Sequence, residues 1–315
     1  MPRLDDGAVE DTSAGLAGES NSDRVDERND WTLLPNGSLL SLSDASRVLE
    51  AVPAQIIMFV GEKKVGKTTL LAELHHAFLA GPVGDQLFAG SITLPAFENF
   101  CFRSRIRSRR SRGETTRTSL AAGVKVLHLR VRNKVERTPA TNLLLADTSG
   151  EAFKAMRMRK EEVDVLAPLL VRADAVVVLT DGRKIASPQA AQQARTNTRT
   201  LIRVLLERRA VSASSALHLV ITKWDEVVRA GATAGAEAHF QEVTETFGSS
   251  VGTIDCHRVA ARPHPQARLE RYFGLPDLLA ALLRPVPKVA LNYPRLEVPS
   301  TARSYLRFRN GGTDV

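Results

Sequence analysis

The stretch QIIMFVGEKKVGKTTLLAELHHAFLA, residues 55–80, decides the fold that we predict for this chain. Its first six residues are apolar enough for a buried strand, and residues 67–80 have the length and composition of a helix. Between them, GEKKVGKT at 61–68 fits the pattern G-x-x-x-x-G-K-[ST]. In this context glycines let backbone N–H groups turn toward phosphate oxygens, and the helix N-terminus adds its positive dipole end. The stretch therefore predicts a phosphate-binding loop.

Several residues of this loop have expected roles. The residues predicted to contact nucleotide are Gly61, Lys64, Val65, Gly66, Lys67, Thr68 and Thr69. The ammonium of Lys67 is expected to reach the β- and γ-phosphates and to assist catalysis, while the Thr68 hydroxyl binds Mg²⁺. The side chain of Lys64 either points across the phosphates as an extra positive charge or faces solvent, and for Lys63 we favour solvent.

Outside this stretch, short runs rich in leucine and β-branched residues alternate with longer helical stretches. Strands are expected at 55–60, 124–131, 141–147, 175–181, 217–223 and 253–261, and helices near 67–80, 153–172, 185–208, 233–247 and 276–284. This alternation predicts a three-layer α/β fold with a mostly parallel sheet covered on both faces. The runs 124–131 and 141–147 are separated only by a short polar stretch, so we expect an antiparallel hairpin at one edge of the sheet.

A second motif follows the strand expected at 141–147, where the chain reads LLLADTSGE at residues 143–151. An aspartate at the tip of a buried strand is costly unless it meets a cation or a hydrogen-bond network. We therefore expect Asp147 to support Mg²⁺. Gly150 follows at D-x-x-G spacing, where its backbone N–H can contact the γ-phosphate.

A third motif, TKWD at residues 222–225, ends the run LHLVITKWD and has the form [NT]-K-x-D. The Asp225 carboxylate can accept hydrogen bonds from N1–H and the 2-amino group of guanine, whereas adenine has no matching pair of donors. The stem of Lys223 is expected along the base plane, and Thr222 completes the motif. Ala261 lies at the end of the strand expected at 253–261, where guanine-nucleotide folds place a loop whose backbone N–H contacts the base oxygen.

Together GEKKVGKT, DTSG, TKWD and VAAR resemble the Ras-like, translation-factor-related P-loop GTPases in order and position. The finer text, including FAGSITLPAFENFCFRSR and LLLADTSGEAF, resembles the type-two domain of the bacterial double-GTPase family. The resemblance covers roughly 55–285. It implies a Ras-like fold that binds GTP or GDP with Mg²⁺, and a switch in bacterial conflict or defence modules. A second GTPase or another protein effector is the implied partner, and with one P-loop here that GTPase would be a separate polypeptide.

Hydrolysis needs a group that positions water, and the resemblance identifies two positions. Ras-like proteins have glutamine after the D-x-x-G glycine, whereas this chain has Glu151, which either orients water or caps the following helix. The first-switch threonine that closes over Mg²⁺ is expected at Thr118, with Thr116 as the alternative. A hydrolysing switch is the favoured reading, and a non-hydrolysing GTP-binding scaffold is the alternative. An ATP-driven or kinase-like protein is disfavoured by TKWD.

An arginine-rich stretch lies in an enlarged first-switch region, about residues 81–120. Its arginines are Arg103, Arg105, Arg107, Arg109, Arg110, Arg112 and Arg117. Four interpretations of this stretch stay open: it supplies an arginine finger, it binds a partner, it binds nucleic acid, or it is a mobile solvated loop. No aromatic residue is interleaved within 103–117, which disfavours binding of single-stranded nucleic acid through Arg103–Arg117.

Composition sets the remaining expectations. Residues 1–30 hold nine acids and three arginines, so the net charge of +8 divides into −6 there and +14 beyond. We interpret 1–30 as a disordered acidic tail, 31–285 as the GTPase domain and 286–315 as a Pro-rich extension. No apolar run is long enough to span a membrane and no signal peptide is evident, so we expect a cytoplasmic protein. Only Cys101 and Cys256 are present, which indicates neither disulfides nor a cysteine zinc site.

Overall fold

The computed structural model describes residues 37–108, 125–135, 138–148, 172–211 and 215–284. All of them belong to the unit Pro35–Val315, one of two into which the chain divides. The expected acidic tail at 1–30 and the Pro-rich extension at 286–315 lie outside the described residues.

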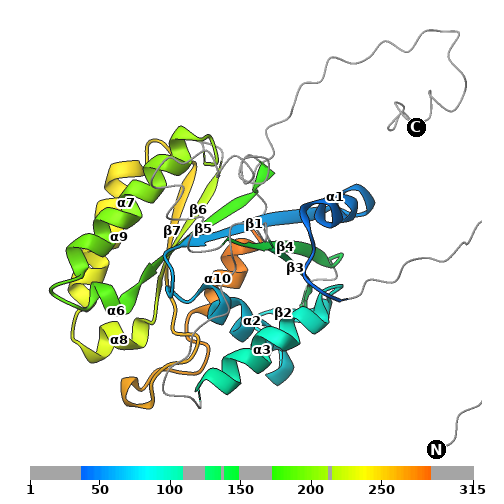
Figure 1. The fold of residues 1–315 in the computed structure, drawn as a ribbon, viewed down its shortest axis with the longest axis horizontal. Helices are drawn as coiled ribbons and strands as arrows, with labels where there is room; N and C mark the ends of the chain where they lie inside the picture. The colour runs from blue at the N-terminus through cyan, green and yellow to red at the C-terminus, as the bar shows by residue number, and fades with distance from the viewer. Residues whose placement is uncertain (1–36, 109–124, 136–137, 149–171, 212–214, 285–315) are drawn as a thin grey trace, which may run out of the picture. The chain divides into compact units, whose positions relative to one another are not determined.

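The described residues form one sheet with the strand order β2-β3-β4-β1-β5-β6-β7 (Figure 1). The strands are β1 (Ala54–Gly61), β2 (Gln86–Gly90), β3 (Lys125–Asn133), β4 (Thr141–Asp147), β5 (Ala175–Asp181), β6 (Ala216–Thr222) and β7 (Thr253–Arg258). The neighbouring pairs from β4 through β7 are parallel, whereas β3 runs antiparallel to both β2 and β4. The carboxyl ends of β4, β1, β5, β6 and β7 therefore meet at one edge of the sheet.

The predicted α/β fold class is confirmed, and all six expected strands are present. The hairpin expected from 124–131 and 141–147 is formed by β3 and β4. One detail differs from the prediction, because β2 pairs with the outer side of β3 and the hairpin is not outermost. With five residues that end in Gly90, β2 carries too little periodic signal to be recognised from the sequence.

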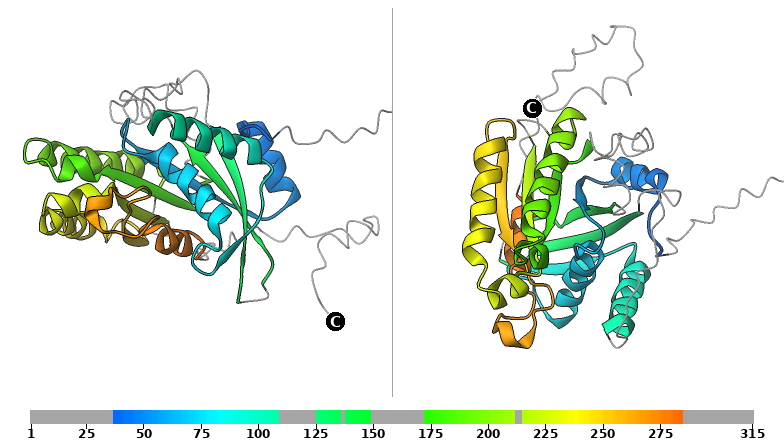
Figure 2. Two further views of the ribbon diagram at one scale, coloured as in Figure 1. Left: turned by 90° about the horizontal axis from the view of Figure 1, so that it is seen from below. Right: turned by 60° about the vertical axis from the view of Figure 1, so that its left-hand side comes forward.

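Helices cover both faces of the sheet (Figure 2). They are α1 (Leu42–Ala51), α2 (Lys67–Ala80), α3 (Leu94–Ser108), α6 (Gly182–Ile185), α7 (Ala191–Glu207), α8 (Trp224–Arg229), α9 (Thr233–Phe247) and α10 (Leu275–Leu282), with a short 3-10 turn at Pro265–Ala267. One hydrophobic core contains residues of α1, α7, α8 and α9, and the other contains residues of α2, α3 and α10. This confirms the three layers.

Strand β1 shows why the sheet must be covered on both faces. Ile56 and Met58 lie in the core beneath α7 and α9, while Ile57 and Phe59 lie in the core beneath α2. All four side chains are buried. A parallel strand buried on both faces is a continuous apolar run, which is how residues 55–60 read.

The region 81–120, expected as an enlarged first switch with a mobile loop as one reading, contains regular structure in its first part. It includes β2 and α3, and α3 is anchored by Phe97 and Cys101, which are 0% and 1% exposed. The mobile loop was one reading of the arginine-rich stretch 103–117, and it is wrong for residues 103–108, which belong to α3. Residues 109–120, with Thr116 and Thr118, lie outside the described residues.

Other expected helices differ only in their limits. The helix expected at 185–208 is divided into α6 and α7, and the one expected at 276–284 is α10. The helix expected at 153–172 lies outside the described residues, apart from its last position. Among the described helices, none combines the length and apolar character that crossing a membrane requires.

Candidate functional site

The candidate site lies where β1, β4, β5 and β6 reach their carboxyl ends. Their last residues are Gly61, Asp147, Asp181 and Thr222. Strand register keeps these ends close together, since Phe59 pairs with Asp147 and Asp181 pairs with Thr222. In open α/β sheets, ligands bind in the crevice outside the carboxyl ends of the strands.

The loop between β1 and α2 curls around the amine of Lys67. Gly66 has φ 109°, a left-handed conformation that favours glycine, and caps the start of α2. Lys67 Nζ donates hydrogen bonds to the carbonyls of Gly61 at 2.8 Å and Glu62 at 3.4 Å. Burial lowers the pKa of the Lys67 ammonium, although the negative charges of Asp147 and Glu62 oppose this effect. A buried cation thus lies at the centre of the loop.

The Thr68 hydroxyl and Asp147 form a small cluster of oxygen atoms beside this lysine. Thr68 Oγ1 donates a hydrogen bond to Asp147 Oδ2 at 3.3 Å. Asp147 Oδ1 is buried and has no hydrogen-bond partner within the part of the chain that the structure describes. Burial raises the pKa of the Asp147 carboxyl, while Lys67 and the Thr68 hydrogen bond lower it.

These oxygen atoms fit a hard cation. Mg²⁺ prefers oxygen ligands and is usually bound by one or two protein groups together with phosphate and water. A hydroxyl and a carboxylate with one buried oxygen that has no partner among the described residues provide such a donor set.

The segment after β6 is hydrogen-bonded directly to the phosphate loop. Thr222 Oγ1 donates to the Val65 carbonyl at 2.6 Å, and Lys223 Nζ donates to the Lys64 carbonyl at 2.8 Å. Lys223 has φ 51°, so the chain turns sharply between β6 and α8. These bonds hold the TKWD segment against the loop that surrounds Lys67.

Asp225 lies in the first turn of α8 and is 7% exposed. Its Oδ2 accepts a hydrogen bond from the backbone N–H of His264 at 3.0 Å. A carboxylate has two oxygens and several lone pairs, so this one contact leaves acceptor capacity. Trp224 beside it is 4% exposed and belongs to the core, which anchors the segment.

The loop after β7 reaches the same place. The N–H of Trp224 donates to the Val259 carbonyl at 3.1 Å, and Ala260 N–H donates to Phe273 at 3.0 Å. Ala261 directly follows Ala260 in the chain and comes three residues before His264. The loop containing Ala261 therefore lies beside Asp225, at the carboxyl edge where it was expected.

Asp181 was missed in the sequence although it ends a buried strand as Asp147 does. Its Oδ2 accepts a hydrogen bond from Lys223 Nζ at 2.6 Å, and its Oδ1 accepts from Arg183 N–H at 3.0 Å. The next residue, Gly182, packs so closely that a Cβ there would lie 2.2 Å from the Thr222 carbonyl oxygen. Asp181 thus caps α6 and holds Lys223 against the phosphate loop.

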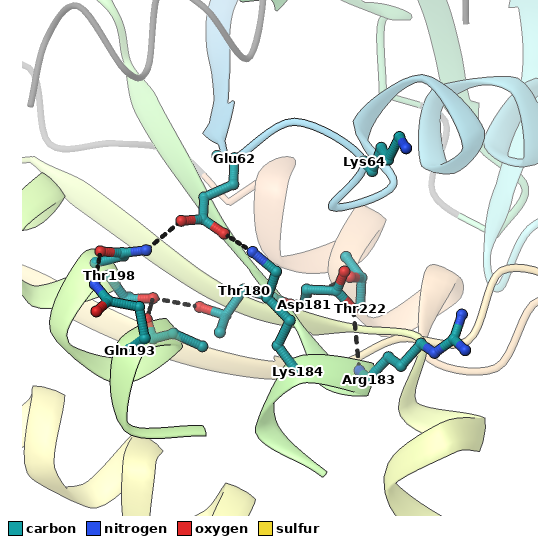
Figure 3. A network of polar contacts seen from close by, with 12 residues as sticks. Glu62, Lys64, Thr180, Asp181, Arg183, Lys184, Gln193, Thr198 and Thr222 are labelled. Atoms are coloured by element: carbon teal, nitrogen blue, oxygen red, sulfur yellow. Dashed lines mark hydrogen bonds and ion pairs between the residues drawn. The ribbon is translucent and has the colours of Figure 1, made fainter. Parts of the chain in front are cut away.

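Glu62 was also missed, because its partners are distant in sequence (Figure 3). Its carboxylate forms an ion pair with Lys184 of α6 and accepts a hydrogen bond from Asn197 of α7. The neighbouring Thr180 and Thr198 hydroxyls are 2.9 Å apart. The second residue of the phosphate loop is thereby tied to the helices that follow β5.

The exposed lysines of the loop do not join this network. Lys63 and Lys64 are both exposed, and in Figure 3 the Lys64 side chain points away from Glu62. The solvent-facing reading therefore describes both side chains in this structure. The carbonyl of Lys64 contributes instead, as the acceptor for Lys223.

The structure brings most of the expected site residues to one edge of the sheet. Those in the described part are Gly61, Lys64, Val65, Gly66, Lys67, Thr68, Thr69, Asp147, Thr222, Lys223, Asp225 and Ala261. Thr118, Gly150 and Glu151 lie outside the described residues. The roles assigned to all of these residues stay predictions.

A parallel sheet with a phosphate loop after β1 and a TKWD turn after β6 defines the Ras-like P-loop GTPase fold. The family model for the domain described as Double-GTPase 2 matches residues 55–283. The chain therefore belongs to the double-GTPase 2 family.

Solved structures show similarity at low identity. Translation elongation factor SelB from Methanococcus maripaludis, in complex with the GTP analogue GppNHp, is 13% identical with TM-score 0.40, over 75% of this chain and 35% of that one. The GTPase-like domain of S. cerevisiae Ski7, bound to GDP and inorganic phosphate, is 14% identical with TM-score 0.40, over 69% of this chain and 45% of that one.

The signal recognition particle receptor SRb-GTP/SRX complex from Chaetomium thermophilum is 13% identical with TM-score 0.36. This match covers 66% of the present chain and 90% of that chain. In contrast, the present chain spans only 35% of the length of elongation factor SelB. No curated protein sequence is significantly similar to the chain.

Proposed function

We propose that the chain binds guanine nucleotide together with Mg²⁺ and hydrolyses GTP as a switch. One observation carries the proposal. The TKWD segment is hydrogen-bonded to the phosphate loop through Thr222 to Val65 and through Lys223 to Lys64. This contact supports the proposal, because one nucleotide would have to reach both Lys67 in the loop and Asp225 in the TKWD segment.

At the phosphate end, we expect the hydrogen-bond acceptors of Lys67 to change when a nucleotide binds. Its ammonium is held by the Gly61 and Glu62 carbonyls in a buried position that lowers its pKa. Phosphate oxygens carry full negative charge, so hydrogen bonds from Lys67 to them are stronger than those to neutral carbonyls. We infer that the β- and γ-phosphates take the place of these carbonyls, with the N–H groups of 61–69 around them.

Beside Lys67, Thr68 and Asp147 would hold the metal. Bound Mg²⁺ would neutralise the charge that develops between the β- and γ-phosphates. Thr68 supplies a hydroxyl oxygen, and Asp147 supplies the buried Oδ1 that has no partner within the described residues. The proposal accounts for a carboxylate that is costly to bury alone.

At the base end, Asp225 would select guanine. Its Oδ2 is fixed by the His264 N–H, and the carboxylate keeps acceptor capacity for N1–H and the 2-amino group. Adenine offers no such donor pair and would leave a nearly buried carboxylate unmatched. The backbone at Ala261 would face the base oxygen from the adjoining loop.

Hydrolysis requires residues that the sequence pattern alone assigns. We assign Glu151 to positioning water, Gly150 to the γ-phosphate and Thr118 to the metal from the sequence pattern. The alternative is a GTP-binding scaffold that does not hydrolyse, which the glutamate in place of glutamine favours. We propose that the GTPase domain comprises residues 31–285. In either case its proposed partner is a protein effector or a separate GTPase.

Phosphate release under single-turnover conditions separates these two readings. The full chain loaded with GTP and Mg²⁺ is expected to release phosphate slowly but measurably, and Glu151→Ala should reduce that rate at least tenfold. Lys67→Ala provides the background. Tight GTP binding with phosphate release no faster than this background would exclude the GTPase and leave the scaffold.

A further inference from the structure

A second cluster of metal-ligating side chains lies away from the nucleotide site, on the last two strands. His218 comes from β6, while Asp255 and His257 come from β7. The two strands are parallel and His218 is paired in register with Asp255. Alternate residues of a strand point to one face, so Asp255 and His257 both point to the face of their neighbour His218. Thr222 ends β6 four residues later, about 13 Å along the strand.

The distances within this cluster match those between the ligands of one metal ion. His218 Nδ1 lies 3.2 Å from His257 Nε2 and 3.5 Å from Asp255 Oδ2. All three ligand atoms lie within 4.8 Å of one another. Tetrahedral zinc with bonds of about 2.0–2.1 Å requires its ligand atoms to be about 3.3–3.4 Å apart. Two of the three edges already have nearly this length.

The cluster is sheltered, yet it can be reached from solvent. The His218 side chain is 2% exposed, whereas the Asp255 side chain is 26% exposed. Burial lowers the pKa of His218 to about 4, with further lowering by His257, and burial also lowers the pKa of His257. Both imidazoles are therefore neutral near pH 7, the form in which histidine binds metals.

We propose that His218, Asp255 and His257 bind one Zn²⁺ ion through His218 Nδ1, His257 Nε2 and one Asp255 oxygen, with water in the fourth position. Two imidazoles and a carboxylate are a ligand set that zinc accepts in tetrahedral geometry. Without metal, one of the two facing ring nitrogens donates a proton to the other across 3.2 Å. Zinc binding needs a change of tautomer that frees both of these nitrogen lone pairs for the ion.

The ion would join the two strands at the end of the sheet. Strand β7 is the outermost one, and β6 leads into the TKWD segment. The metal would form one ligand bond to β6 and two to β7, in addition to the backbone hydrogen bonds that pair the two strands. We expect zinc to stabilise the folded chain without entering the nucleotide site.

Mutation of Arg284 is expected to change zinc affinity in the opposite direction from mutation of a ligand. Its Nη2 lies 2.9 Å from Asp255 Oδ2, the oxygen nearest His218, and its side chain is 60% exposed. The guanidinium competes for a proposed ligand atom and places a positive charge beside the site. Removing it should tighten zinc binding, whereas removing a ligand should weaken it.

Calorimetric titration of ZnCl₂ tests the proposal on the full chain, with no histidine tag and with GDP and excess Mg²⁺ present. We expect one zinc per chain with micromolar or tighter affinity. Asp255→Asn and His257→Gln should each weaken binding at least tenfold, and Arg284→Gln should tighten it several-fold. His76→Gln serves as the matched control and should leave zinc affinity unchanged. His76 lies on α2 and contacts the Tyr272 hydroxyl, so it is not part of the cluster.

A Co²⁺ titration reports ligand geometry independently, because tetrahedral Co²⁺ has intense visible bands. These bands should appear in the unmodified chain and be lost in Asp255→Asn. Asp255 is partly exposed, so this variant remains informative if a histidine variant fails to fold. Equal zinc affinity in the unmodified chain and Asp255→Asn, or no zinc bound at one equivalent, would leave a hydrogen-bonded His–His–Asp cluster and overturn the proposal.

Discussion

Asp147 and Asp225 both follow buried strands at the same edge of the sheet, but their surroundings differ. Asp147 has a hydroxyl contact on one oxygen and, among the described residues, no partner for the other, and burial raises its pKa. Asp225 is oriented by the backbone N–H of His264 on a neighbouring loop. We propose on these grounds that the first meets a cation and that the second accepts hydrogen bonds from a ligand.

The difference between them has a structural origin. Asp147 is the last residue of β4 and lies beside the phosphate loop with Lys67 and Thr68. Asp225 lies three residues beyond the end of β6, in a turn held by Thr222, Lys223 and Asp181. We therefore base the proposed metal role of Asp147 and the proposed base role of Asp225 on their positions relative to the phosphate loop.

The largest expected effect lies at the phosphate end. Lys67→Ala should reduce affinity for GTP by about 100-fold or more, because charge-assisted bonds to the β- and γ-phosphates are lost. Fluorescence titration with a labelled nucleotide measures this loss. Lys63→Ala, which changes an exposed lysine of the same loop, should bind almost normally. Micromolar GTP affinity in Lys67→Ala would disprove the phosphate-loop assignment.

At the base end, Asp225→Asn should weaken GTP binding by about 10- to 100-fold and improve xanthosine triphosphate binding, since an amide donates where a carboxylate only accepts. Competition between the two nucleotides gives the ratio directly. Glu226→Gln changes the adjacent carboxylate, which pairs with Arg229, and should leave the ratio unaltered. If Asp225→Asn keeps its guanine preference, Asp225 does not contact the base.

Asp147→Asn sharpens the contrast because its two expected effects have opposite signs. In EDTA, the variant should be as stable as the unmodified chain or more stable, since a buried carboxylate oxygen without a partner in the described structure is replaced. With Mg²⁺, its GTP affinity should be about tenfold lower. Thermal unfolding and nucleotide titration, each with and without Mg²⁺, measure the two effects. Equal Mg²⁺ dependence in both proteins would exclude Asp147 from the metal site.

The smallest expected effect concerns the residue that positions Lys223. Asp181→Asn keeps an acceptor for the N–H of Arg183 but removes the charge that pairs with Lys223. We expect guanine affinity to fall about three- to tenfold, in line with loss of a partly buried ion pair. Asp174→Asn, at the start of β5, is the control. A change in ATP affinity as large as that in GTP affinity would show that Asp181 does not contribute to selection of the base.

The sequence predicted the parts of the fold that are encoded locally. The apolar run before GEKKVGKT, the aspartate ending 141–147 and the TKWD turn each carry their signal within a few residues. Helix α3 was missed because its apolar positions are not clearly periodic and three arginines lie in its last part. Helix α1 was missed as well, although Ser41 and Asp44 form a capping box at its start.

Contacts between distant segments could not be predicted in the same way. Asp181 meets Lys223 across 42 positions, and Glu62 meets Asn197 across 135. Asp181 belongs to no recognised motif, and Glu62 occupies a variable position of G-x-x-x-x-G-K-[ST], so only the folded chain brings them to their partners. Asp181 did carry a usable signal, since it ends a buried strand at the same edge as Asp147.

The central claim is that a carboxylate beside the phosphate loop selects guanine. Calorimetric titration of the full chain with GTP and with ATP, at equal Mg²⁺, tests this claim most directly. We expect GTP to bind at least about 100-fold more tightly than ATP, because adenine leaves the Asp225 carboxylate unmatched. Equal affinity for the two nucleotides would contradict it.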